Sequence, residues 1–249
     1  DMEFVMSTPD EVLDRAKGRK GPSTSKLLGR EIKTWWILIM RPIEDYLIEK
    51  KVHPNILTIT SLIVSAIAGF LFHLGWIFIA GIVLLAGSNF DMLDGRVARA
   101  QGLSSEYGAF FDSCLDRFAE ILIYLGLLSY FHGTPFSYLV FLILGATTMV
   151  SYTRARAESL GIDCEVGMMQ RTERIVYLGA FSVFNLFGNL TTSALGLRPG
   201  DYLLKLALAI ILVLSAYTAI ERMIYVTKRL KERGDRRIEE TSDETPTDG

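Results

Sequence analysis

The chain has 249 residues, half of them hydrophobic, and a positive mean hydropathy of +0.30. A soluble domain of this length would carry polar faces throughout, so the composition indicates an integral membrane protein and argues against a soluble one. The net charge of −2 gives no reason to expect a nucleic-acid partner.

The N-terminal fifty residues divide into two parts. Residues 1–22 are polar and charged, and we expect them to form a flexible cytoplasmic leader. Residues 23–50 place apolar side chains, including Trp35 and Trp36, at helical spacing between Lys and Arg residues. This pattern predicts an amphipathic helix lying in the cytoplasmic membrane interface, with its cations toward anionic lipid. A helix packed on a soluble partner is the alternative interpretation.

The rest of the chain is dominated by apolar stretches, and a membrane-spanning helix needs about 20 mostly apolar residues. Pro54 can open a helix at its first turn. Six candidate spans follow it, at about residues 56–74, 76–90, 110–131, 136–152, 175–190 and 203–226. We therefore predict an all-α integral membrane fold in which residues 51–227 form a six-helix transmembrane catalytic domain. Residues 228–249 are expected to form a charged, disordered cytoplasmic tail.

The distribution of cations predicts the orientation. With both termini in the cytoplasm, only Arg198 and Lys205 of the 26 Lys and Arg residues fall near the opposite face. This arrangement satisfies the positive-inside rule, so we expect a protein of the cytoplasmic membrane whose site faces the cytoplasm.

Four aspartates lie where the second predicted span ends and the third begins. Asp91 and Asp94 are three residues apart and Asp112 and Asp116 are four apart, so each pair projects from one helical face. An unpaired aspartate near the membrane centre costs at least about 2.5–3.5 kcal/mol, so such a cluster needs cations. Hard divalent ions suit carboxylate oxygens. The four carboxylates are enough for a site with two Mg²⁺ or Mn²⁺ ions.

Small residues and one arginine lie among these aspartates. Gly95, Ala98 and Gly108 leave room for a ligand to approach the backbone, and Arg99 offers a cation to phosphate. Together with a divalent metal, this set is typical of a diphosphate-binding site.

The spacing of these positions resembles the complete diagnostic motif of the CDP-alcohol phosphotransferases, integral-membrane enzymes of phospholipid synthesis. The matching positions are Asp91, Asp94, Gly95, Ala98, Arg99, Gly108, Asp112 and Asp116. The resemblance covers the whole membrane part and implies six spans, a preceding interfacial helix and a homodimer. It further implies transfer of a phosphatidyl or archaetidyl group from CDP-diacylglycerol or CDP-archaeol to an alcohol, with release of CMP.

The resemblance also implies roles for single residues. Asp91, Asp94 and Asp112 would hold the metals, and Asp116 would be both a shared ligand and the general base. The cytidine diphosphate site would be lined by Gly95, Ala98, Arg99 and Gly108, with Asn55 and Thr58 as further contacts.

Four arginines near the loop between the fourth and fifth predicted spans indicate an anionic acceptor, because a guanidinium binds phosphate in a bidentate manner. They are Arg154, Arg156, Arg171 and Arg174. Their pattern is similar to that of prokaryotic phosphatidylinositol-phosphate and archaetidylinositol-phosphate synthases, so inositol phosphate is the expected acceptor. Glycerol 3-phosphate and serine are alternatives.

Simpler interpretations of these charged residues stay open. The arginines would also satisfy the positive-inside rule alone, paired with Glu158, Glu165 and Glu173. Glu120, one turn beyond Asp116, is expected to tune the site or to bond to a neighbouring helix.

Two other functions remain as competing hypotheses. An intramembrane prenyltransferase also binds a magnesium diphosphate, but it would normally show two separated acidic motifs where this chain has one. A cation transporter would need acids at mid-membrane with access to both faces, whereas these aspartates lie toward one end of their helices.

Overall fold

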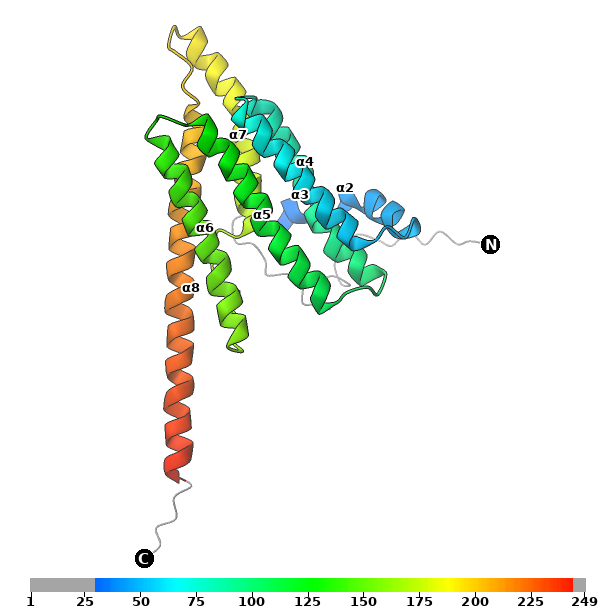
Figure 1. The fold of residues 1–249 in the computed structure, drawn as a ribbon, viewed down its shortest axis with the longest axis vertical. Helices are drawn as coiled ribbons and strands as arrows, with labels where there is room; N and C mark the ends of the chain where they lie inside the picture. The colour runs from blue at the N-terminus through cyan, green and yellow to red at the C-terminus, as the bar shows by residue number, and fades with distance from the viewer. Residues whose placement is uncertain (1–29, 244–249) are drawn as a thin grey trace, which may run out of the picture.

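The computed structural model describes residues 30–243, and over that range the chain is built from helices without strands. The helices are α2 (Arg30–Glu49), α3 (Pro54–His73), α4 (Ile77–Ala100), α5 (Glu106–Tyr130), α6 (Phe136–Ser159), α7 (Arg171–Ala194) and α8 (Tyr202–Asp243) (Figure 1). Each of the six predicted apolar stretches falls on one of α3 to α8. The prediction of an all-helical chain is confirmed for the described residues.

The bundle is held by one large apolar core. Phe72 of α3, Leu84 of α4, Leu127 of α5, Ile143 of α6 and Leu208 of α8 belong to the same buried cluster. Since Leu178 of α7 also belongs to it, side chains from six helices meet in this cluster, and the relative positions of these helices are fixed by packing. The core therefore sets where the polar ends of the helices meet.

Helices α3 and α5 cross at two glycines. A Cβ atom built on Gly126 would overlap the backbone of Gly69, and a Cβ atom on Gly69 would overlap the backbone of Leu122. Small residues allow two helix backbones to approach this closely, which is a common packing mode in membranes. The crossing holds α5, which carries Asp112 and Asp116, against α3.

Five described helices are long and apolar enough to cross a membrane: α3, α4, α6, α7 and the first 34 residues of α8. Helix α5 has 25 residues, but it carries Asp112, Asp116, Arg117 and Glu120. These charges lower its hydropathy, so five spans are supported by composition and the sixth remains a prediction.

Helix α2 packs beside the C-terminal half of α4 (Figure 1). Leu47 and Ile48 of α2 pack in a second apolar cluster with Leu93 of α4, and Glu44 forms an ion pair with Arg96 of α4. The predicted helix at 23–50 is thus present over Arg30–Glu49, while residues 23–29 and the predicted leader at 1–22 lie outside the described residues. The interfacial position of α2 remains a prediction.

Helix α8 extends further than the sequence analysis anticipated. It runs without a break to Asp243 and reaches well beyond the other helices (Figure 1). The expectation of disorder from residue 228 is therefore wrong as far as residue 243, because a run rich in Lys, Arg and Glu has high helix propensity. Residues 244–249 lie outside the described residues.

The two ends of the bundle differ in character. At one end, which we call the motif end, α4 finishes and α5 and α7 begin. At the opposite end Asp201 accepts hydrogen bonds from Tyr130 of α5 at 2.6 Å and from Asn185 and Asn189 of α7 at 2.8 Å each. A cavity of about 670 Å³ lies beside this network, and none of the four motif aspartates lines it.

Candidate metal and diphosphate site

A tight turn at the motif end places the two acidic helix segments side by side. Helix α4 ends at Ala100, and Gly102 then adopts φ +69°, a left-handed conformation that glycine tolerates. Ser105 caps α5 by accepting a hydrogen bond from the amide of Gly108 at 3.1 Å. The chain therefore reverses within a few residues, and the end of α4 faces the start of α5.

Three of the four predicted ligands converge at this point. Asp91 of α4 and Asp112 and Asp116 of α5 each offer one ligand atom, and these atoms lie within 4.8 Å of one another. We call them the three-aspartate cluster. Asp112 Oδ1 is buried and has no hydrogen-bond partner among the described residues. Partly buried carboxylate oxygens, one of them unpartnered, fit a hard divalent cation.

Asp94 lies one turn further along α4, in a different environment. It is buried, its Oδ2 accepts a hydrogen bond from the Thr58 hydroxyl at 2.9 Å, and its Oδ1 accepts one from the amide of Gly95 at 2.5 Å. The structure therefore pairs Thr58, which the resemblance assigns to the nucleotide, with an aspartate that it assigns to the metals. The hydrogen bond fixes the orientation of the Asp94 carboxylate.

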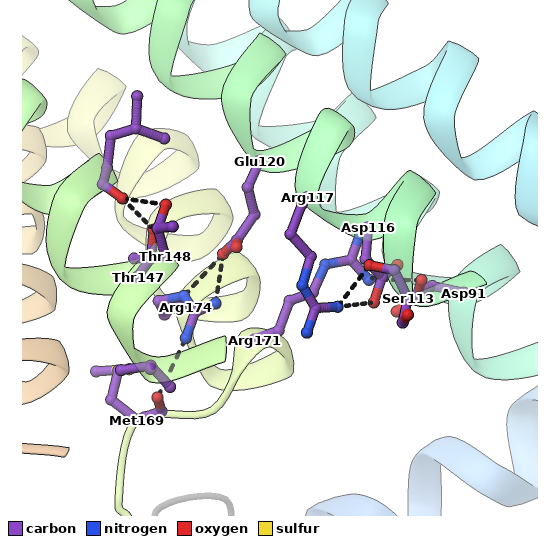
Figure 2. A network of polar contacts seen from close by, with 12 residues as sticks. Asp91, Ser113, Asp116, Arg117, Glu120, Thr147, Thr148, Met169, Arg171 and Arg174 are labelled. Carbon is purple, nitrogen blue, oxygen red and sulfur yellow. Dashed lines mark hydrogen bonds and ion pairs between the residues drawn. The ribbon is translucent and has the colours of Figure 1, made fainter. Parts of the chain in front are cut away.

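Arg171, the first residue of α7, contacts the three-aspartate cluster directly. Its Nη1 lies 2.5 Å from Asp91 Oδ1 and 2.6 Å from Asp116 Oδ1, and its side chain is 13% exposed. Figure 2 shows this side chain reaching from α7 toward Asp116. The guanidinium thus bridges a carboxylate of α4 and one of α5. From the sequence, Arg171 was expected to bind the acceptor, and this bridge was not expected.

One turn further along α7, Arg174 forms a buried ion pair with Glu120. Its Nη2 lies 2.5 Å and its Nε 2.8 Å from Glu120 Oε1, and its Nη1 donates to the Met169 carbonyl at 3.2 Å (Figure 2). The expectation that Glu120 bonds to a neighbouring helix is confirmed. Because the Arg174 side chain is only 2% exposed, an acceptor phosphate would have to compete with Glu120 for it.

The other two predicted acceptor arginines lie on the exposed end of α6. Arg154 pairs with Glu158 at 2.8 Å, and Arg156 donates to the Ser159 hydroxyl at 3.5 Å. The pair of Arg154 with Glu158, which the simpler interpretation expected, is therefore present in the structure. An exposed pair of this kind is weak and leaves Arg154 available to a ligand.

The predicted cytidine diphosphate residues cluster along α4 and its neighbours. A Cβ atom on Gly95 would lie 3.4 Å from the Arg99 guanidinium, so Gly95 leaves the space beside that cation open. Arg99 itself is exposed, while Ala98, Gly108 and Asn55 are half-buried. The structure thus leaves Arg99 accessible beside the glycine, and the role of this group in nucleotide binding remains a prediction.

Arg222 of α8 is a buried cation that the sequence analysis missed. Its Nη1 donates to the Val150 carbonyl at 2.6 Å and its Nε to the Val166 carbonyl at 2.8 Å. It therefore fastens the segment before α7 to α6 and α8. The only signal was an arginine inside an apolar run, which is expensive in a membrane without partners.

The sequence comparisons agree with the motif. A family model described as CDP-alcohol phosphatidyltransferase matches residues 51–220. The archaetidylinositol phosphate synthase of Methanothermobacter thermautotrophicus is 38% identical over 176 residues, which cover 70% of this chain and 83% of that protein.

The structural comparisons also find enzymes of this kind. The phosphatidylinositol phosphate synthase of Mycobacterium tuberculosis with CDP-DAG bound is similar, with a TM-score of 0.63 and 27% identity over 76% of this chain and 93% of that chain. A structure of the same enzyme with manganese and citrate matches with a TM-score of 0.63 and 26% identity, covering 74% of this chain and 87% of that chain.

These matches separate the competing hypotheses. They support a phosphatidyltransferase and give no support to the prenyltransferase or the cation transporter. The family model spans the three-aspartate cluster, Asp94 and the α7 arginines together. This chain belongs to the CDP-alcohol phosphatidyltransferase family.

Proposed function

We propose that the protein transfers a phosphatidyl or archaetidyl group from a CDP-linked lipid to inositol phosphate and releases CMP. The observation that carries this proposal is the three-aspartate cluster, whose oxygens lie within 4.8 Å of one another, next to the α7 arginines. The names of similar synthases favour an inositol phosphate acceptor and either CDP-diacylglycerol or CDP-archaeol as donor.

The metal site of this proposal consists of Asp91, Asp94, Asp112 and Asp116, with two Mg²⁺ or Mn²⁺ ions. The similar synthase crystallised with manganese supports this choice of ion. Bound divalent ions would neutralise the diphosphate and stabilise CMP as the leaving group. Asp112 Oδ1, which has no hydrogen-bond partner among the described residues, offers a ligand atom for this purpose.

The donor and acceptor sites flank these carboxylates. Gly95, Ala98, Arg99, Gly108, Asn55 and Thr58 form the proposed cytidine diphosphate site, and Arg154, Arg156, Arg171 and Arg174 the acceptor site. Asp116 is the proposed general base, which takes the proton from the acceptor hydroxyl as that oxygen attacks the lipid-side phosphorus. The arginines would hold the acceptor so that its hydroxyl is oriented for this attack.

The proposed membrane arrangement follows from charge and length. We infer that α3 to α8 form six spans, that α2 lies in the interface, and that the motif end and both termini face the cytoplasm of the inner membrane. The positive-inside rule supports this orientation. The motif resemblance adds a homodimer to the proposal.

The direct test is an acceptor panel with the purified protein, magnesium and CDP-diacylglycerol, in which CMP release is measured. Inositol phosphate, glycerol 3-phosphate, serine and inositol would be compared at equal concentration, with CDP-archaeol as the alternative donor. The proposal predicts that inositol phosphate gives the fastest release. Release with serine alone would contradict the acceptor and leave the reaction class intact.

A further inference from the structure

The charge of Arg171 is placed where a divalent ion would bind. Its Nη1 lies within 2.6 Å of oxygens from both Asp91 and Asp116, two members of the three-aspartate cluster. The other charges near these groups are the carboxylates of Asp112 and Glu120 and the guanidinium of Arg117, which lies 3.6 Å from Asp116 Oδ2. A guanidinium in this position balances part of the negative charge that a metal ion would also balance.

The neighbouring arginine of α7 is not arranged in this way. Arg174 is held by Glu120 and the Met169 carbonyl, which lie outside the three-aspartate cluster. Arg171, in contrast, has carboxylates of the cluster as its ion-pair partners. Since it begins α7, its side chain leaves from a helix end that adjoins the loop of residues 160–170. The side chain is 13% exposed, so the guanidinium is not fully enclosed by the cluster.

We propose that Arg171 is a positioning residue that couples metal binding to acceptor binding. Arg171 and the divalent ion share Asp91 and Asp116, so metal binding weakens the hold of these carboxylates on the guanidinium. The released guanidinium is then available to the acceptor's phosphate. Metal therefore favours anion binding, and by thermodynamic reciprocity a phosphate-like anion favours metal binding.

This inference rests on the proposed metal site, and it deepens the predicted acceptor role of Arg171. The acceptor role of Arg171 would then depend on the metal, because the same side chain contacts the metal ligands and would bind the acceptor's phosphate. Removing the Arg171 charge therefore has two expected consequences. Metal binds more tightly, because a competing cation is gone, and metal binding becomes insensitive to the anion.

The first measurement is the affinity of the full-length purified protein for Mn²⁺, read from the electron paramagnetic resonance signal of the free ion. Arg171→Gln is expected to lower the Mn²⁺ dissociation constant at least about tenfold, because a unit charge a few ångströms from the metal has an effect of this order. Arg171→Lys keeps the charge and is expected to stay near the wild-type value. Arg229→Gln, at an exposed arginine of α8 that lies 3.7 Å from Glu232 and belongs to no proposed site, is the matched control and is expected to leave Mn²⁺ affinity unchanged.

The second measurement repeats the titration in sodium sulfate and in sodium chloride at equal ionic strength. Sulfate is the probe for the acceptor's phosphate. Tighter Mn²⁺ binding in sulfate is expected for the wild-type protein and for Arg229→Gln, and no difference is expected for Arg171→Gln. A sulfate effect that survives in Arg171→Gln would overturn the coupling.

The remaining outcomes are also decisive. If Arg171→Gln binds Mn²⁺ equally or more weakly, the guanidinium only holds the carboxylates in place and the inference fails while the metal site stands. If Arg171→Gln does not fold, Arg171→Lys decides alone, since a sulfate effect equal to that of wild type supports the proposal and its loss contradicts it. If the wild-type protein binds no Mn²⁺, the proposed metal site itself fails.

Discussion

Neighbouring carboxylates at the motif end have different partners, and these partners indicate different tasks. Asp94 is held by Thr58 and the amide of Gly95, whereas Asp112 has an oxygen without a hydrogen-bond partner among the described residues. Asp116 has Arg171 beside one oxygen and Arg117, at 3.6 Å, beside the other. A fixed carboxylate suits a structural ligand, while one with exchangeable partners suits proton transfer.

The role of Asp116 leads to a prediction for catalysis. Asp116→Asn keeps the shape of the side chain and removes the proposed base, so CMP release should fall by about 10²–10⁴-fold. Binding of the CDP-lipid should remain measurable by calorimetry, because Asp91, Asp94 and Asp112 are unchanged. Asp163→Asn, at an exposed loop position, is the matched control. Full activity in Asp116→Asn would remove this residue from the base role.

The Glu120 and Arg174 pair predicts a stability effect. Arg174→Met leaves the buried Glu120 charge unpaired and should cost about 3–5 kcal/mol of unfolding free energy. The double variant Glu120→Leu with Arg174→Met removes both charges and should recover most of that loss. Thermal unfolding of the detergent-solubilised protein measures both variants. Equal destabilisation of the single and double variants would show that packing, and not the ion pair, is responsible.

At the scale of elements, the α3 and α5 crossing fixes the helix that carries Asp112 and Asp116 against α3. Gly126→Ala would press a methyl group into the backbone of Gly69, whereas Gly145 of α6 has no atom within 4 Å of an added Cβ. We expect Gly126→Ala to destabilise the protein by about 1–3 kcal/mol or more. Gly145→Ala should be neutral or slightly stabilising, because alanine has the higher helix propensity. Equal unfolding temperatures for the two variants would contradict the close crossing.

The Asp201 network joins α5, α7 and α8 at the opposite end of the bundle and predicts a pH dependence. Burial raises the pKa of the Asp201 carboxyl, but hydrogen bonds from Tyr130, Asn189 and Asn185 outweigh it, so the pKa lies below its ordinary value. A group whose folded-state pKa is lowered stabilises the fold above its unfolded pKa of about 3.9. That contribution is lost as the pH falls through the folded-state pKa.

The corresponding measurement compares Asp201→Asn with the wild-type protein by thermal unfolding at several pH values. At pH 7 the variant should be less stable by about 1–3 kcal/mol, because charged hydrogen bonds are lost. The difference should shrink as the pH falls below about 4, where the Asp201 carboxyl of the unfolded chain becomes protonated, and it should be lost below the lower folded-state pKa. A difference that does not change with pH would show that the Asp201 charge is not involved.

The acidic motif could be predicted from sequence because its residues are local and have a fixed spacing. Three of its aspartates meet in the structure, and each predicted apolar stretch lies on a helix. The bridge from Arg171 to Asp91 and Asp116 could not be predicted, since it depends on how α7 packs against α4 and α5. The extension of α8 was missed because high charge was interpreted as disorder, although the same residues have high helix propensity.

At the scale of the whole molecule, the position of α5 in the membrane is the main open prediction. If α5 spans the bilayer, Leu103 before it and His132 after it lie on opposite sides. Single cysteines at these two exposed positions, in a background without Cys114 and Cys164, can be labelled with a membrane-impermeant thiol reagent in intact cells. We expect Leu103→Cys to be protected and His132→Cys to react. The same reactivity at both positions would reduce the number of spans to five.

We propose that carboxylates from α4 and α5 together bind the metal that holds the lipid-linked diphosphate. Anomalous diffraction at the manganese edge, from crystals grown with Mn²⁺ and CDP-diacylglycerol, tests it most directly. We expect anomalous peaks in contact with Asp91, Asp112 and Asp116, beside density for the diphosphate. Manganese bound elsewhere, or a diphosphate in density remote from these aspartates, would contradict it.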